Sequence, residues 1–293
     1  MIVVTTPTGQ IGASLLPRLL EAKTEVRVIA RDPSKLPTEI RERVDIVEGS
    51  HRDLQVMSAA LRSADALFLV VPPGFEQSGA HHRYLDFAHT ASTALRENDV
   101  RRVVGVTSAG HDWPEQAGLL SAAFAMDAAL RETGVAYRAL SMPWFMENLL
   151  NQMGAIRDTG QLSMGYASER VLPSIAAQDI AKAAAGLLLD PTWTGQEDVP
   201  VFGPDRLTPV EMAGVIGRVL GRSIQYVQVG LETISARILG RGAPQVVADD
   251  MIQMIAAQNA GIYDVDLIMS SPTETNFETW VETVLRPVFD TQL

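Results

Sequence analysis

The stretch with the clearest chemical potential is "TPTGQIG" (Thr6 to Gly12), which directly follows a short apolar run, Ile2 to Thr5. A pyrophosphate binds backbone N–H groups at a helix N-terminus when no side chain stands in the way. Gly9 lets the backbone approach the phosphates, and Gly12 lets the next helix pack against the strand. Because Thr6 carries a Cβ, it fits this turn only with a negative φ, and its hydroxyl could bind a phosphate.

The turn therefore predicts a dinucleotide site, because it follows a strand-like run and precedes a helix-like segment. The alternative is an ordinary strand–helix turn. The residues that we expect to hold the nucleotide are Thr6, Pro7, Thr8, Gly9, Gln10 and Ile11.

A second candidate group is "ARDPSK", at the end of the next apolar run. An arginine at that position accommodates a 2′-phosphate, whereas a carboxylate binds a free ribose 2′-OH. Arg31, with Lys35 as a second positive charge, favours NADP(H), and NAD(H) is the weaker candidate. Asp32 leaves two alternatives open, since it could reach a ribose hydroxyl or cap the next turn. The alternative for Arg31 is a solvated charge in a loop that binds no ligand.

Candidate catalytic groups stand in "TSAGHDW", after a later apolar run. Ser108 could hydrogen-bond a nicotinamide or a substrate. His111 could donate a proton, because its ordinary pKa lies near neutrality, and Asp112 could orient it. The alternative is that Ser108 caps a turn and that the other two lie in a solvated loop.

Large apolar side chains could form a ligand pocket, since such pockets are mostly apolar. Core packing is the alternative, and for any single methionine it is the favoured one. The pocket candidates are Trp113, Trp144, Met146 and Tyr166. We expect no metal site: His81 and His82 are adjacent, and we expect them on a solvated helix start without a carboxylate partner at helical spacing.

The elements that must position these residues alternate along the first half of the chain. Six short apolar runs are separated by helix-like stretches, which is typical of βαβ units in a doubly wound parallel sheet. The runs are 2–5, 26–30, 44–48, 66–71, 102–107 and 137–141. Pro17 interrupts the first helical pattern and should kink that helix or remove one hydrogen bond.

After Ser141 the regular alternation of apolar runs and helix-like stretches ends. The stretch 144–165 shows no clear strand, 176–189 is helical, and 199–202 reads as one more strand. Thr208, Pro209 and Glu211 form a helix-start signature. We expect a dinucleotide-binding domain over 1–143, to which 175–202 returns, and a smaller, mostly helical substrate lobe over 144–174 and 203–293.

Composition limits the function classes. The 293 residues include 24 basic and 35 acidic side chains, a net charge of −11 that disfavours nucleic acid as a partner. There is no cysteine, so disulfides and thiolate chemistry are excluded. No apolar stretch approaches the ~20 residues of a membrane span. We expect a cytoplasmic protein, a monomer or homodimer, with a small apolar molecule as its partner.

With these residues in view, the chain resembles the NmrA-like family, atypical members of the short-chain dehydrogenase/reductase superfamily. "TPTGQIG" looks like the family's glycine motif with its first glycine changed. The more specific similar segments are "PWFMENL" (143–149) and "FGPDRLTPVEMAGVIGRVLGRSIQYVQV" (202–229). The resemblance implies a Rossmann-like NADP domain with a small C-terminal substrate lobe. It covers nearly the whole chain.

By that resemblance, further residues would contact the nucleotide. These are Ser50, Val70, Val71, Pro72, Pro143 and Phe145. "LFLVVPP" (67–73) is similar to the family segment that supplies three of them. Three departures stand out: Ser50 replaces a frequent aspartate, Ser141–Met142 precede Pro143 where Arg-Pro is frequent, and Ala123 replaces a lysine common in family reductases.

The superfamily's usual Tyr and Lys, four residues apart, are missing, which disfavours ketone reduction by that route. Hydride transfer to an electron-poor acceptor needs mainly alignment. The sequence therefore predicts an NADPH-dependent reductase of an apolar, electron-poor acceptor such as a quinone or an imine. The alternative is a non-catalytic NADP(H)-sensing regulatory protein that binds a protein partner.

Overall fold

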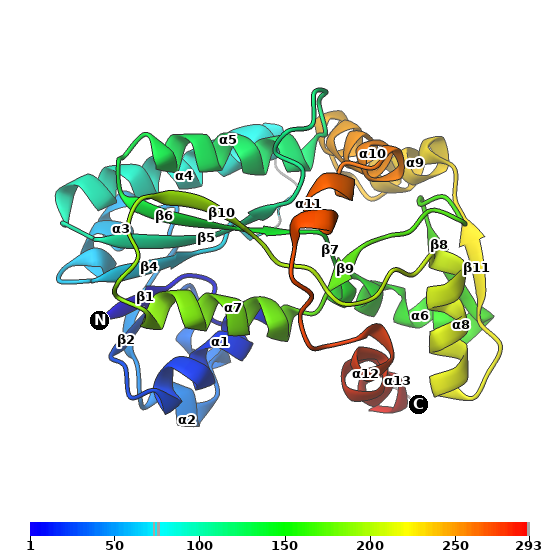
Figure 1. Ribbon diagram of the computed structural model, residues 1–293, viewed down its shortest axis with the longest axis horizontal. Helices are drawn as coiled ribbons and strands as arrows, with labels where there is room; N and C mark the ends of the chain where they lie inside the picture. The colour runs from blue at the N-terminus through cyan, green and yellow to red at the C-terminus, as the bar shows by residue number, and fades with distance from the viewer. Residues whose placement is uncertain (73, 75–76, 292–293) are drawn as a thin grey trace. The chain divides into compact units, whose positions relative to one another are not determined.

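The computed structural model describes residues 1–72, 74 and 77–291, and the chain divides into two compact units (Figure 1). The first unit comprises Met1–Ser108, Leu120–Ser141 and Ile180–Val199; the second comprises Ala109–Leu119, Met142–Asp179 and Pro200–Leu293. These boundaries differ from the expected ones in three places, the first being that Met142 and Pro143 belong to the second unit. Ala109–Leu119 belongs to the second unit, and the returning segment is the shorter Ile180–Val199. Residue 73 of the "LFLVVPP" segment lies outside the described residues.

The first unit is built on a seven-stranded sheet of order β10-β6-β5-β4-β1-β2-β3. Its strands are β1 (Ile2–Val4), β2 (Val26–Ala30), β3 (Asp45–Glu48), β4 (Ala66–Leu69), β5 (Arg102–Ser108), β6 (Ala136–Met142) and β10 (Gln196–Pro200). The pairs β1–β2, β2–β3, β1–β4 and β4–β5 are parallel. The order reverses between β1 and β4, the switch point where such sheets bind ligands. The predicted Rossmann-like fold is confirmed.

Helices cover both faces of this sheet, with α4 and α5 on one side and α1 and α7 on the other (Figure 1). Their bounds are α1 (Gln10–Glu21), α3 (Leu54–Leu61), α4 (Gly79–Glu97), α5 (Leu119–Arg131) and α7 (Ala177–Leu189), with short turns η1 (Pro33–Lys35) and α2 (Thr38–Arg41). Pro17 lies inside α1, which continues past it, so it removes a hydrogen bond without ending the helix. Fully buried side chains such as Leu67 and Val103 fill the layer beneath α3–α5.

The second unit is mostly helical, with two small parallel pairs, β7–β9 and β8–β11. Its elements are β7 (Trp144–Phe145), η2 (Met146–Gln152), α6 (Met153–Thr159), β8 (Gln161–Met164), β9 (Ser174–Ile175), α8 (Pro209–Leu220), β11 (Gln225–Gln228), α9 (Leu231–Gly240), α10 (Gln245–Ala260), α11 (Asp264–Met269), α12 (Phe277–Trp280), η3 (Val281–Leu285) and α13 (Arg286–Thr291). Two expectations were wrong. The stretch 144–165 contains β7 and β8, whose partners come from later in the chain. The strand expected at 199–202 is β10, ending at Pro200.

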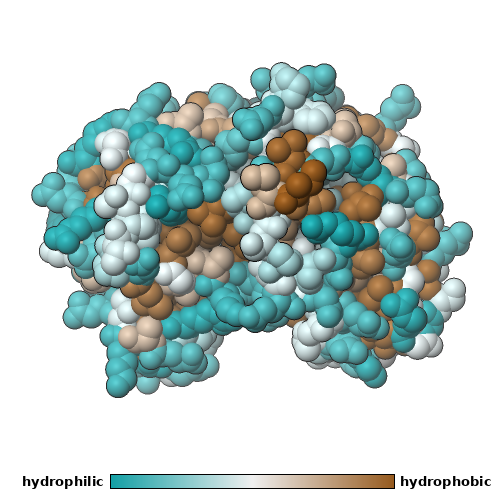
Figure 2. Space-filling model, viewed as in Figure 1, coloured by the Kyte–Doolittle hydropathy of each residue, from teal (hydrophilic) through white to brown (hydrophobic). Residues whose placement is uncertain are grey.

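Two helix starts that lie in the second unit, those of α8 and α7, are capped by side chains. Thr208 and Glu211 form the predicted capping box of α8. The N–H of Ala177, at the start of α7, donates to Oε1 of Glu147 at 2.9 Å, so Glu147 caps this helix. A space-filling view shows an apolar patch over α11 (Figure 2), where Ile268 and Met269 are 82% and 77% exposed.

Candidate functional site

The opening turn is built around an unusual backbone conformation at Thr6. Its φ is +47°, so the expectation of a negative φ was wrong. The Thr6 carbonyl accepts from the N–H of Gly9 at 3.0 Å and lies over the start of α1. A Cβ on Gly12 would stand 2.3 Å from that carbonyl oxygen, so the turn closes because Gly12 has none. A left-handed conformation costs a non-glycine residue about 1–2 kcal/mol.

The N-terminus of α1 is open to an anion. Gly9 is the N-cap residue, no side chain caps the helix, and its first turn holds no acidic residue. The first N–H groups of a helix lack intrahelical partners and carry a partial positive charge. Backbone N–H groups of this kind can bind an anion, and the pyrophosphate contact of the turn stays a prediction. Gln10 is exposed, whereas the side chain of Ile11 is buried in the core, so only its backbone faces the turn.

A cavity of about 580 Å³ opens beside this turn, entirely within the first unit. It is lined by Thr6, Pro7, Thr8, Gly9, Ile29, Ala30, Arg31, Asp32, Lys35, Gly49, Ser50, His51, Arg52, Pro72, Arg83 and Phe87. The wall contains four cations (Arg31, Lys35, Arg52, Arg83) against one carboxylate, Asp32. In a chain of net charge −11, this local excess favours an anionic ligand.

The carboxylate of this wall is already engaged. Asp32 accepts from the N–H of Ser34 at 3.1 Å and from its hydroxyl at 2.6 Å, so it caps η1. These bonds from Ser34 lower the pKa of Asp32. Lys35 lies 3.8 Å from the same carboxylate. Arg31 is exposed and, within the described part of the chain, makes no hydrogen bond or ion pair. Of the two alternatives for Asp32, the structure shows the cap.

The loop after β4 is held by two side chains that follow strands β1 and β3. The Thr5 hydroxyl donates to the carbonyl of Phe68 at 3.1 Å and accepts from the N–H of Val70 at 2.9 Å. Nε2 of His51 lies 3.1 Å from the Val70 carbonyl. The following Val71 is 7% exposed, so its side chain belongs to the core. The carboxyl ends of β1, β3 and β4 are thereby fixed together at the cavity.

Beyond this loop, Pro72 lines the cavity, and its carbonyl accepts from Nε of Arg83 at 2.9 Å. The Ser50 hydroxyl accepts from the N–H of Arg52 at 3.2 Å. Arg52 also pairs with Asp86, and both guanidinium groups stand over the ring of Phe87.

Sequence reasoning missed seven residues of this wall, and four of them carry charged or aromatic side chains: His51, Arg52, Arg83 and Phe87. The first two follow β3 directly, and the carboxyl ends of parallel strands meet at one edge, so that position was a usable signal. Arg83 and Phe87 come from α4, and their approach to the cavity depends on how that helix packs.

Comparison with known proteins agrees with this site. The model of a family described as NAD(P)H-binding matches residues 7–191. The NAD(P)H azoreductase of Xenophilus azovorans is 30% identical over 282 residues, covering 94% of this chain and 95% of that protein. The chain is an NmrA-like member of the NAD(P)H-binding family.

Two further proteins resemble this NmrA-like chain over most of its length. The (4-alkanoyl-5-oxo-2,5-dihydrofuran-3-yl)methyl phosphate reductase of Streptomyces griseus subsp. griseus is 28% identical, covering 89% of this chain and 88% of that protein. The crystal structure of the Escherichia coli NADPH-dependent quinone oxidoreductase QOR2 with NADPH has a TM-score of 0.78 at 20% identity, covering 97% of this chain and 100% of that one. At this identity the second likeness concerns the fold.

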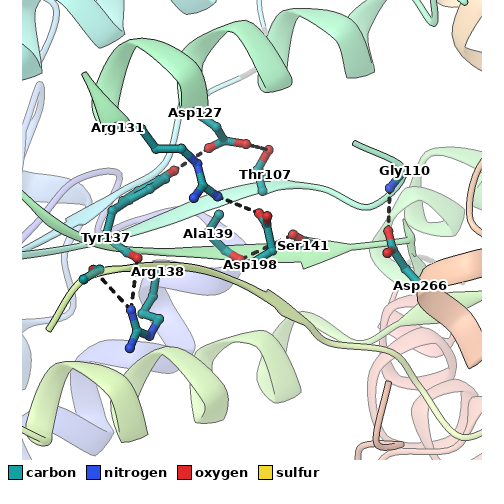
Figure 3. Close-up of polar contacts among 11 residues, drawn as sticks. Thr107, Gly110, Asp127, Arg131, Tyr137, Arg138, Ala139, Ser141, Asp198 and Asp266 are labelled. Carbon is teal, nitrogen blue, oxygen red and sulfur yellow. Dashed lines mark hydrogen bonds and ion pairs between the residues drawn. The ribbon is translucent and has the colours of Figure 1, made fainter. Parts of the chain in front are cut away.

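Ala123 stands where family reductases often have a lysine, and about one helical turn later Asp127 forms a buried polar cluster. Asp127 of α5 accepts hydrogen bonds from the hydroxyls of Thr107 on β5 and Tyr137 on β6 (Figure 3). Burial and the Asp127 charge raise the pKa of Tyr137 well above its usual value. A Cβ on Gly105 would come within 2.3 Å of the Tyr137 hydroxyl oxygen, so this glycine makes room for the contact. Tyr137 is thus a structural hydrogen-bond donor.

The catalytic candidates stand at and after the end of β5. Ser108 is its last residue and is 6% exposed, and Ala123 on α5 is 4% exposed. In the second unit, the N–H of Gly110 donates to Asp266 of α11 at 2.6 Å (Figure 3). His111 and Trp113 follow in the same loop and are half-buried. The catalytic roles of Ser108 and His111 stay predictions.

The residues expected at a substrate pocket lie in the second unit. Trp144 and Tyr166 are 7% and 6% exposed, with ring centroids 6.2 Å apart, and Met146 is fully buried. All three belong to the apolar core of that unit, as the core-packing alternative predicts. Pro143 is buried and Phe145 is half-buried. Their contact with a ligand stays a prediction.

The described residues contain neither a metal-binding cluster nor a membrane-spanning helix. No group of three or more His, Cys, Asp or Glu side chains there could hold a metal ion. His81 and His82 are exposed near the start of α4, but Nε2 of His82 lies 3.6 Å from Asp86, so the expectation of no carboxylate partner was wrong. No helix of the described chain is long and apolar enough to cross a membrane.

Proposed function

We propose that this protein is an NADPH-dependent reductase of an apolar, electron-poor acceptor such as a quinone or an imine. One observation carries the cofactor choice. The wall next to the open helix end presents Arg31 without a partner in the described chain, while Asp32 is engaged by Ser34. Oδ1 of Asp32 accepts both Ser34 bonds and Oδ2 lies 3.8 Å from Lys35, whereas the Arg31 guanidinium is available and matches a phosphate in geometry.

The donors of the cavity fit this nucleotide in kind. The turn from Thr6 to Gly9 and the N-terminus of α1 would hold the pyrophosphate by backbone N–H groups. Arg31 would bind the 2′-phosphate, with Lys35 contributing a weaker, more distant charge. When bound, the nicotinamide supplies a hydride to the acceptor.

The acceptor class follows from what the chain offers for proton transfer. Tyr137 is buried and hydrogen-bonded to Asp127, and the raised pKa of Tyr137 makes it a poor acid at neutral pH. Ser108 and His111 are the remaining candidates, and a strong acid–base pair of the Tyr–Lys kind is missing from the sequence. An electron-poor acceptor needs less acid assistance. The reductase names of the relatives support the same class.

The test is NADPH oxidation by the purified chain with a small panel comprising a quinone, an azo dye and an iminium compound. Calorimetric titration with NADPH accompanies each assay. We expect binding and turnover with at least one acceptor. The Gly9→Val variant is the control, because a side chain there would obstruct the phosphates and remove both signals. Tight binding without turnover across the panel would instead favour an NADP(H)-sensing protein.

A further inference from the structure

His51 lines a part of the cavity to which the proposed function assigns no phosphate group. The residue is 5% exposed, and its ring packs against Phe87 with ring centroids 4.5 Å apart and an interplanar angle of 35°. Nε2 lies 3.1 Å from the Val70 carbonyl oxygen. A carbonyl can only accept, so Nε2 carries the hydrogen. The other nitrogen, Nδ1, then has a lone pair and is a hydrogen-bond acceptor.

The imidazole stays neutral under ordinary conditions. Burial lowers the pKa of His51 to about 4, with a smaller contribution from the charges of Arg31 and Arg83. At neutral pH, Nδ1 is therefore an acceptor and not a second donor. Within the described chain, the hydrogen bond of the His51 ring is the one between Nε2 and the Val70 carbonyl, and none is made by Nδ1.

The cavity has three chemically different walls. The opening turn suits a pyrophosphate, and Arg31 with Lys35 suits a 2′-phosphate. The third wall is formed by His51, Pro72 and Phe87, at the ends of β3 and β4 and on α4. It presents two rings and a proline beside the Arg52 and Arg83 guanidinium groups, and Nδ1 of His51 is an acceptor nitrogen among them. Adenine is flat and carries an amino group, N6, that donates hydrogen bonds.

We propose that Nδ1 of His51 accepts a hydrogen bond from the adenine amino group, so that His51 selects the base of the cofactor. This assignment rests on the proposed cofactor and does not require turnover. Ser50 is the neighbouring polar residue, and its hydroxyl accepts from the N–H of Arg52. The proposal places the specificity on His51, and Ser50→Ala is its control.

The experiment compares NADPH with its hypoxanthine analogue, in which a carbonyl oxygen replaces the amino group. Calorimetry gives the ratio of the two dissociation constants for the wild type, His51→Phe and Ser50→Ala. We expect the wild type to bind the analogue about tenfold more weakly, because two acceptors would face each other. His51→Phe should bring the ratio close to one, and Ser50→Ala should keep the wild-type ratio.

A second measurement on the unmodified protein covers the case in which His51→Phe does not fold. In ¹⁵N-labelled wild type, the Nδ1 resonance of His51 should move in the direction of a hydrogen-bonded acceptor with NADPH and not with the analogue. Equal affinities for the two nucleotides, or a ratio that survives in His51→Phe, would overturn the assignment while leaving the cofactor proposal intact. Failure of the wild type to bind NADPH would overturn both.

Discussion

Replacing Arg31 by alanine should separate NADPH from NADH. The two nucleotides differ by the 2′-phosphate, and Arg31 is the cation of the β2 end that has no partner in the described chain. Because the side chain is exposed and bonded to no other group there, its removal should leave the fold unchanged. The loss should therefore appear in the affinity for NADPH and not in stability.

The magnitude follows from the kind of contact that is lost. Hydrogen bonds to a charged group contribute about 1.5–3 kcal/mol, which corresponds to a factor of about 10–150 in the dissociation constant. Lys35 is 72% exposed and 3.8 Å from Asp32, so Lys35→Ala should cost a factor of about five at most. Affinity for NADH should change by less than about twofold in either variant.

Calorimetric titration of each variant with NADPH and NADH measures these ratios, with Arg41→Ala as a control. Arg41 is also an exposed arginine of the first unit, at the end of α2, and does not line the cavity. Ser34→Ala provides the converse test, because it removes one of the two hydrogen bonds that Oδ1 of Asp32 accepts and should raise the relative affinity for NADH. Equal losses for NADPH and NADH in Arg31→Ala would refute the 2′-phosphate assignment.

Three further changes test other parts of the structure. Thr6→Gly should raise the free energy of unfolding by about 0.5–1 kcal/mol in urea titrations, since relief of the left-handed strain exceeds the entropic cost of glycine. Tyr137→Phe should lower it by about 1–3 kcal/mol, because buried Asp127 loses a donor. Burial raises the pKa of the Glu147 carboxyl above 4.5 in the folded state. The folded state therefore binds this proton more tightly than the unfolded state does, and the free energy of unfolding falls as pH rises from 4.5 through the folded-state pKa. Glu147→Gln should remove that slope from the melting temperature.

Each of these tests has its own contradicting result. A less stable Thr6→Gly would mean that the threonine side chain contributes more than its backbone strain costs. No loss in Tyr137→Phe would mean that the buried contact has no net stabilising effect; Tyr84→Phe, on α4, is a matched control outside that hydrogen bond. Identical pH profiles of the melting temperature for wild type and Glu147→Gln would show that the pKa of this carboxyl is the same in the folded and unfolded states.

Local patterns in the sequence were enough for the fold class and for half of the site. Continuous apolar runs gave the parallel strands, since strands buried on both faces need no alternation. The glycine turn and Arg31 were identifiable because each follows a strand end by a fixed spacing. The capping box at Thr208 was equally local. Strands β7 and β8 escaped detection, because two- and four-residue strands depend on partners far along the chain.

The sequence by itself determined that a strand–turn–helix with Gly9 and Gly12 opens the chain and that an arginine ends the second strand. Only the tertiary structure decided the conformation of Thr6, the capping role of Asp32 and the place of His51 on the cavity wall. The physical reason is the same in each case. A side chain's hydrogen-bond partner, and hence its tautomer or availability, is set by residues that folding brings together, such as Val70 beside His51.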